Sequence, residues 1–301
     1  MSRSTLVAAL ALLAACALPV TASAAPKHHA KPKAKLYVSI GDSYATGYQA
    51  TGVRQGGPTT NGFANQLPAL AKRRGHKLKL VNFGCGGATT TSILHSDGCA
   101  ESARAIGGPR YDVPQIEAAE RFVRRNRKRV ALVTVSIGGN DVTRCAAGGV
   151  DPIPCVAGAV SDLEANVGEV ARRLRAAGGK KVRIVGTTYP DVILGAWTSG
   201  QPADQDLARL SVVAFQTLIN PTLKKAYEAA GGTLVDVTAA TGAYGSLDAT
   251  TTFDPYGVVP VPVAEVCRLT YYCEFRDIHA RTDGYRIIAE LVADTLPKRR
   301  R

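Results

Sequence analysis

The chain has 301 residues, 46% of them hydrophobic, which is enough to bury a large core in a single domain. Its formal net charge is +13, and much of the excess lies at the two ends. We expect the basic segment 25–35 and the basic tail 298–301 to be disordered, solubilising ends rather than nucleic-acid contacts. After residue 24 no segment is long and apolar enough to cross a bilayer, so the composition predicts a mature protein without a membrane span.

The N-terminus has the pattern of an export signal. Arg3 precedes an uncharged apolar run from Leu6 to Ala15, and Ala22-Ser23-Ala24 provides small residues at a cleavage site. We therefore expect residues 1–24 to be a signal peptide and the protein to be secreted. Cys16 leaves an alternative, because Leu-Ala-Ala-Cys also resembles the lipidation site of a bacterial lipoprotein.

Six cysteines follow the signal, and an even number in an exported chain predicts disulfides. They lie as close pairs along the sequence, so the simplest connectivity is 85–99, 145–155 and 267–273. A metal site is disfavoured, because no Cys-x-x-Cys occurs and no histidine lies near a cysteine pair at ligand spacing. We therefore expect no metal.

Apolar, β-branched runs bounded by turn residues alternate with segments of helical periodicity. This alternation predicts a five-stranded parallel sheet covered by helices on both faces, in one domain over residues 36–297. Two stretches, 84–109 and 242–273, are expected to be irregular. The expected strands are 36–40, 78–83, 130–137, 181–188 and 233–237, and the expected helices are 63–74, 113–127, 156–177, 207–230 and 282–296.

The most distinctive polar sequences follow the first three strands. They are Gly41-Asp42-Ser43, the run 85–89 (Cys-Gly-Gly-Ala-Thr) and Gly138-Gly139-Asn140-Asp141. If the strand order is 2-1-3-4-5, these three loops adjoin one another at the carboxyl edge of the sheet, where such folds bind ligands. Asp42 and Asp141 are expected to act as structural hydrogen-bonding residues.

This set of residues suits acyl transfer by a serine nucleophile. Ser43 would attack a carbonyl carbon, and the backbone N–H groups of Ser43 and Gly87 with the amide of Asn140 would form an oxyanion hole. Among five histidines, His279 stands at the start of the last helix and is expected to be the acid/base. His95, in a polar loop, is a weaker candidate.

On these four blocks the chain resembles the GDSL/SGNH hydrolases. Ser43, Gly87, Asn140 and His279 match the four signature residues of that family in order, over about residues 36–296. The cysteine pairs and Tyr44 are similar to those of secreted actinobacterial esterases and lipases. The resemblance implies a three-layer α/β/α, flavodoxin-like fold, no cofactor and hydrolysis of carboxylic esters.

One position departs from the family pattern of Asp-x-x-His. Arg276 occupies the site three residues before His279, and Asp277 stands two residues before it. Either the Asp277 carboxylate or a nearby backbone carbonyl is expected to orient the imidazole, and the sequence leaves both open.

The sequence thus predicts a secreted serine esterase or lipase, monomeric, acting on a small-molecule or lipid ester. Polysaccharide deacetylation and phospholipase A activity are alternatives on the same machinery, and a non-catalytic wall- or glycan-binding protein is a third. Trp197 and the stretch 252–272 are possible linings of an acyl pocket, and short to medium acyl chains are expected.

Overall fold

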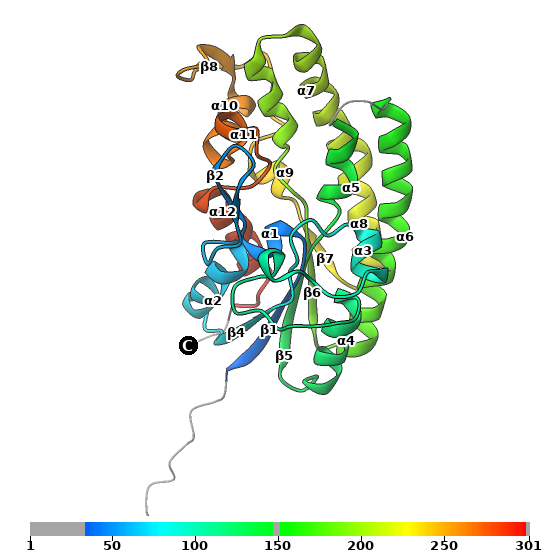
Figure 1. Cartoon of the computed structure of the whole chain (residues 1–301). Helices are drawn as coiled ribbons and strands as arrows, with labels where there is room; N and C mark the ends of the chain where they lie inside the picture. The colour runs from blue at the N-terminus through cyan, green and yellow to red at the C-terminus, as the bar shows by residue number, and fades with distance from the viewer. Residues whose placement is uncertain (1–33, 147–150, 299–301) are drawn as a thin grey trace, which may run out of the picture. The chain divides into compact units, whose positions relative to one another are not determined.

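The computed structural model describes residues 34–146 and 151–298 (Figure 1). The expected signal peptide with Cys16, residues 25–33 of the basic segment and Arg299–Arg301 lie outside the described residues.

Five parallel strands form the central sheet, as the sequence predicted. The order across the sheet is β4, β1, β5, β6, β7, which is the 2-1-3-4-5 order on which the predicted meeting of loops depended. The strands run over Leu78–Asn82 (β4), Lys35–Gly41 (β1), Val130–Ser136 (β5), Arg183–Thr187 (β6) and Thr233–Val235 (β7). Lys35, which we assigned to the basic segment, is thus the first residue of β1.

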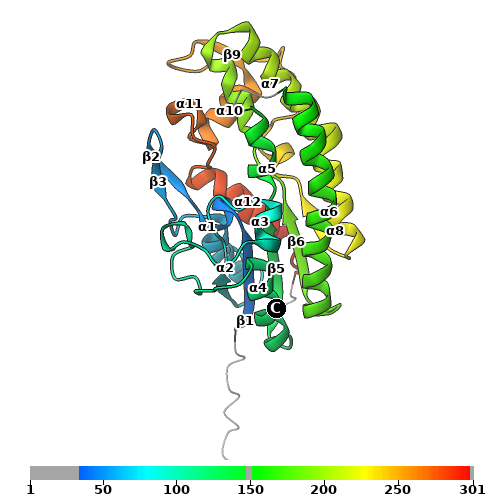
Figure 2. The same cartoon turned by 45° about the vertical axis from the view of Figure 1, so that its right-hand side comes forward.

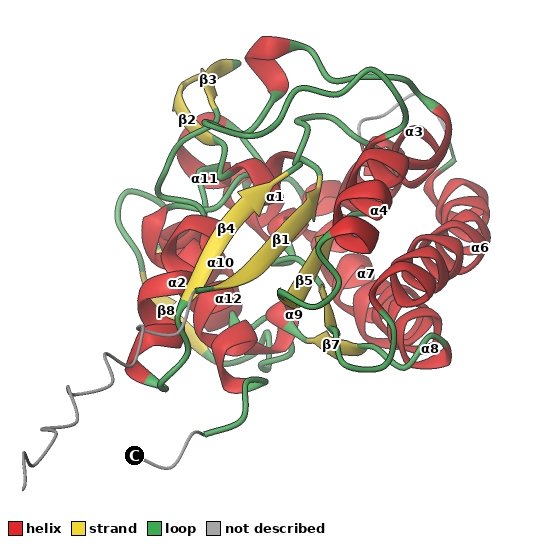
Figure 3. Ribbon diagram, turned by 90° about the horizontal axis from the view of Figure 1, so that it is seen from below, coloured by secondary structure: helices red, strands yellow, loops and turns green. Residues whose placement is uncertain are grey.

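The two faces of the sheet are covered by different helices because successive strand residues point to opposite sides. Tyr37 packs with one hydrophobic cluster and Val38 with the other. Figure 3 shows the helices on either side of the strands. The Tyr37 face packs against α2 (Phe63–Arg73) and α12 (Thr282–Asp294), and the Val38 face packs against α4 (Gln115–Arg125), α6 (Pro152–Gly178) and α8 (Asn220–Ala229).

The expected helix 207–230 is three consecutive elements. Helix α7 (Pro202–Ala214) passes into a π-helical turn, η4 (Phe215–Ile219), and then into α8. Figure 2 shows α7 at the top of the view and α8 lower down, beside α6. A π-turn changes the helical spacing without a proline or glycine, so it leaves no strong signal in the sequence.

The two stretches expected to be irregular contain short elements, which corrects that expectation. Proline is compatible with the first turn of a helix, and Pro262 lies there in the helix Val261–Leu269 (α10). The remaining elements are α1 (Ser43–Thr46), β2 (Gln49–Gly52), β3 (Gln55–Gly57), α3 (Thr90–His95), η1 (Glu101–Ala103), α5 (Gly139–Thr143), η2 (Arg144–Ala146), η3 (Val192–Ser199), α9 (Val237–Ala240), β8 (Thr250–Thr252), β9 (Val258–Pro260), α10 (Val261–Leu269) and α11 (Tyr272–Phe275).

Three disulfides close loops at the carboxyl end of the sheet, and they are the pairs expected from spacing. They join Cys85 to Cys99, Cys145 to Cys155 and Cys267 to Cys273. Within residues 34–146 and 151–298, no helix combines the length and apolarity needed to cross a membrane.

Candidate active site

Ser43 lies at the carboxyl end of β1, where the chain turns directly into α1. Asp42 caps this short helix by accepting a hydrogen bond from the Tyr44 N–H at 2.9 Å. Gly41 has φ +134°, and a Cβ there would lie 1.9 Å from the Ser136 carbonyl oxygen, so only glycine permits this approach of β1 to β5. Ser43 itself is only 6% exposed.

His279 lies between Ser43 and Asp277. Its Nε2 atom is 2.7 Å from the Ser43 Oγ, and its Nδ1 atom is 2.7 Å from the Asp277 Oδ1. The group at Nδ1 is therefore the Asp277 carboxylate, one of the two alternatives left open by the sequence. With Nδ1–H donating to this carboxylate, Nε2 is free to accept the serine proton. The side chains of His279 and Asp277 are 12% and 14% exposed.

Tyrosines on the segment after β1 hold the histidine loop in place. The Tyr44 hydroxyl donates to the Ile278 carbonyl oxygen at 2.6 Å. The Tyr48 ring lies against the His279 imidazole, with 4.1 Å between ring centroids, and the Tyr285 hydroxyl of α12 donates to the Tyr48 carbonyl oxygen at 2.7 Å. Ser43 and His279, 236 residues apart, are thus joined through residues that closely follow Ser43.

The three candidate donors of an oxyanion hole do not all line the same cavity. As the first residue of α1, Ser43 has an N–H with no acceptor inside its helix. The Asn140 side chain lines the same cavity as Ser43, and its Nδ2 donates to the Ala88 carbonyl oxygen at 2.8 Å. Gly87 has φ +78° and lies between Cys85 and Ala88 in the chain. The Cys85 N–H donates to the Gly41 carbonyl oxygen. Gly87 itself lines a different cavity from the one at Ser43.

Asp42 and Asp141 are both buried, and both accept hydrogen bonds from polar groups of other segments. The Asp42 Oδ2 accepts a hydrogen bond from the Tyr189 hydroxyl at 2.6 Å. Asp141 accepts from the N–H and the hydroxyl of Thr90, which ties the start of α5 to the start of α3. Both side chains make the structural contacts expected of them.

The electrostatic environments of Asp42 and Asp277 differ. Burial raises the pKa of Asp42 to about 7, an effect that its hydrogen bonds with Tyr189 and Tyr44 only partly oppose. Burial also acts to raise the pKa of Asp277, but the hydrogen bonds and charge of His279 outweigh it, and the pKa lies below its ordinary value. Asp277 is therefore ionised at neutral pH, as a carboxylate that stabilises an imidazolium must be.

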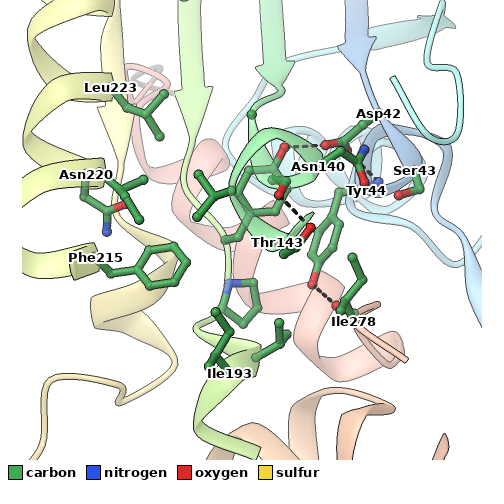
Figure 4. A pocket seen from close by; sticks show the side chains of 17 residues that line it. Asp42, Ser43, Tyr44, Asn140, Thr143, Ile193, Phe215, Asn220, Leu223 and Ile278 are labelled. Carbon is green, nitrogen blue, oxygen red and sulfur yellow. Dashed lines mark hydrogen bonds between the residues drawn. The ribbon is translucent and has the colours of Figure 1, made fainter. Parts of the chain in front are cut away.

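A small cavity of about 30 Å³ opens beside Ser43 (Figure 4). Its walls include Asn140, Tyr189, Ile193 and Phe215. Trp197 and the stretch 252–272 are not part of this wall, and the Trp197 ring instead lies under the Arg209 guanidinium at 4.5 Å. Across the described ranges 34–146 and 151–298, no group of three or more His, Cys, Asp or Glu side chains is arranged to hold a metal ion.

Several positioning contacts were not expected from the sequence. The Gln115 side chain of α4 bonds both the N–H and the carbonyl oxygen of Gly41, at 2.7 and 3.0 Å, and so fixes the end of β1. Tyr48 and Tyr189 likewise reach the site from outside the four motif blocks. A glutamine in the first turn of a helix carries no sequence signal of such a role. The only hint of such contacts in the sequence was the presence of aromatic residues a few positions after Ser43.

The sequence profile of the GDSL-like Lipase/Acylhydrolase family matches residues 39–287. The chain belongs to this family. The match spans most of the chain and contains Ser43, Gly87, Asn140 and His279. Because lipases and acylhydrolases cleave esters, the protein is a carboxylic ester hydrolase.

Two of the similar solved structures are ester hydrolases by their descriptions. An extracellular lipase from Streptomyces rimosus has a TM-score of 0.50 and 17% sequence identity, covering 87% of this chain and 100% of that one. Axe2, an acetylxylan esterase from Geobacillus stearothermophilus, has a TM-score of 0.47 and 16% identity, covering 88% and 96%. The comparison with curated proteins yields no match. At this identity the likeness to the Streptomyces lipase concerns the fold alone.

Proposed function

We propose that the protein is a secreted serine esterase or lipase that forms an acyl-enzyme on Ser43. The observation that carries the proposal is the line of contacts from Ser43 Oγ through the His279 imidazole to the Asp277 carboxylate, with 2.7 Å at each step. A hydroxyl, an imidazole and an ionised carboxylate in this arrangement recur in hydrolases of unrelated folds.

In the proposed mechanism, His279 Nε2 takes the Ser43 proton as Oγ attacks the ester carbonyl carbon. The negative charge on the carbonyl oxygen is met by the N–H groups of Ser43 and Gly87 and by the Asn140 amide. His279 then protonates the leaving alcohol, and the ester bond breaks to leave an acyl-Ser43. Water, deprotonated by His279, attacks this acyl group and restores the free serine.

A serine-reactive phosphonate tests the assignment together with hydrolysis of p-nitrophenyl acetate. We expect labelling of Ser43 and loss of both labelling and hydrolysis in His279→Ala. His95→Ala is the matched control, because His95 is exposed at the end of α3 and contacts none of the three residues. An unreactive Ser43 in folded protein would instead favour the non-catalytic binding protein.

Export is part of the proposal. Three disulfides are typical of proteins that fold in an oxidising compartment, and residues 1–24 have the pattern of a signal peptide. We propose a mature chain with a basic segment that ends before β1, a hydrolase domain from Lys35 to residue 297 and a basic tail, active as a monomer. Recovery of protein beginning at Ala25 from the culture medium supports this proposal, whereas an acylated Cys16 in the membrane fraction supports the lipoprotein alternative.

A further inference from the structure

A second, larger cavity lies directly behind the one at Ser43. It has a volume of about 250 Å³ and lies between α7, η4 and the first turns of α6. Four side chains line both cavities, so the two share a wall: Val142, Ile193, Phe215 and Ile219. Figure 4 shows Phe215 and Ile193 on the side of the smaller cavity away from Ser43. The larger cavity thus adjoins the one at Ser43, and these side chains separate the two.

The lining of the larger cavity is almost wholly apolar. Among the described residues around it, Ser211 alone carries a polar side chain group, and its hydroxyl already bonds the Asp191 carboxyl at 2.8 Å. An apolar cavity of this size does not hold water well and takes apolar ligands. A sugar or a peptide would leave its polar groups without partners there, whereas a hydrocarbon chain would not.

The mouth of this cavity is marked by exposed apolar side chains. Ile153, Leu210, Val213 and Leu218 line it, and each is between 42% and 68% exposed. They account for half of the large exposed hydrophobic side chains in the described part of the chain. Such clustering is typical of a site that receives an apolar partner.

The wall shared by the two cavities is also where the helix geometry changes. Phe215 and Ile219 are the first and last residues of the π-helical turn, and π-turns occur frequently at functional sites. The cavity at Ser43 is narrow, and an acyl chain that reaches the larger cavity from Ser43 passes the shared side chains, among them Phe215 and Ile193. The Cys145–Cys155 disulfide fixes the opposite wall, at the start of α6.

We propose that the cavity between α6 and α7 holds the acyl chain of the substrate, so that the enzyme acts on esters of long-chain fatty acids. This inference rests on the proposed function of Ser43. The proposed acyl chain length differs from the short to medium chains expected from the sequence. The sequence does not show that the residues lining the cavity, from Val142 to Ile219, lie close together, because that depends on how the helices pack.

The acyl series of p-nitrophenyl esters, dispersed in matched detergent, tests the inference. Each methylene buried in the cavity raises kcat/KM by about 4-fold (about 0.8 kcal/mol), so burial of about four of them is sufficient for the laurate ester to exceed acetate by more than about 100-fold. Alkyl acetates, in which the alcohol varies instead, are expected to show a much weaker dependence. A stronger dependence on the alcohol, or a maximum at acetate, would overturn the assignment.

A cavity-filling variant locates the chain. Ala214→Phe places a ring in the cavity and is expected to lower the laurate-to-acetate ratio of kcat/KM by about 10-fold or more. Ala203→Phe is the matched control, because Ala203 is exposed in the first turn of the same helix and lines neither cavity. An unchanged ratio in Ala214→Phe would refute the placement of the acyl chain.

A binding measurement separates failure of this inference from failure of the proposed function. Ser43→Ala is expected to bind a fluorescent long-chain fatty acid, and the Ser43→Ala/Ala214→Phe double variant is expected to lose that binding. Binding by Ser43→Ala together with an unreactive serine in the wild type would leave the cavity assignment standing and refute the catalytic one. Ester hydrolysis at Ser43 without fatty-acid binding would do the reverse.

Discussion

The carboxylate of Asp277 accepts two hydrogen bonds from the same residue, His279, through a single oxygen atom. Its Oδ1 lies 2.9 Å from the backbone nitrogen and 2.7 Å from the Nδ1 of His279. The separation of two residues permits this geometry, because the aspartate turns back on the N–H of the residue two positions later, as in an Asx-turn. The shortened spacing, Asp-x-His, therefore still places a carboxylate at the imidazole.

Replacement of Asp277 by asparagine is expected to lower kcat for p-nitrophenyl acetate by roughly 10²- to 10⁴-fold, because an amide no longer holds the imidazole in the required tautomer or stabilises its charged form. The measurement is steady-state kinetics with the thermal unfolding midpoint recorded alongside. A variant that folds normally and keeps near wild-type turnover would show that the serine and the histidine act without the carboxylate.

Replacement of Asn140 by alanine is expected to lower kcat by about 10²- to 10³-fold with little change in KM, because the amide meets a charge that develops only in the transition state. Asn166→Ala is the control, since Asn166 also donates to this region, to the Thr90 hydroxyl at 3.1 Å, but does not line the cavity at Ser43. Equal losses in the two variants would point to loop packing as the role of Asn140.

Tyr48 packs its ring against His279 and is expected to act as a positioning residue. Tyr48→Ala should lower kcat by about 2- to 10-fold, which corresponds to the energy of one aromatic pair, whereas Tyr48→Phe should retain the contact and the rate. The comparison of kcat with KM in both variants checks this. A rate that depends on the hydroxyl rather than on the ring would argue against stacking as the cause.

Two buried carboxyl groups are expected to make stability depend on pH. Burial raises the pKa of Asp42 and that of Asp191 to about 7 each, from an ordinary value of 3.8. Between these values the folded chain holds more protons than the unfolded chain, so the free energy of unfolding falls as the pH rises towards 7. Each carboxyl contributes a slope of at most about 1.4 kcal/mol per pH unit.

Chemical denaturation at a series of pH values tests this expectation. Asp42→Asn and Asp191→Asn should each flatten the decline in unfolding free energy through this window. The exposed Asp248→Asn should follow the wild type. If the two buried variants retained the full slope, other groups would have to be responsible for it.

Local patterns in the sequence were sufficient for much of this protein. Alternating apolar runs predicted the five strands, because strand and helix periodicities are properties of neighbouring residues. The four motif blocks pointed to Ser43 and His279, and close spacing predicted the disulfides. Local patterns misjudged Lys35, the boundaries of the helix around residues 202–229 and the short elements in the stretches 84–109 and 242–273.

The packed structure alone decided how the side chains meet. The Nδ1 partner of His279 depends on a side-chain rotamer. The stacking of Tyr48 on His279 and the hydrogen bond between Gln115 and Gly41 depend on elements far apart in the chain. The large apolar cavity is formed by five separate elements around a π-helical turn. Periodicity shows which residues are buried, but contacts between distant elements depend on the geometry of packing, which local sequence does not encode.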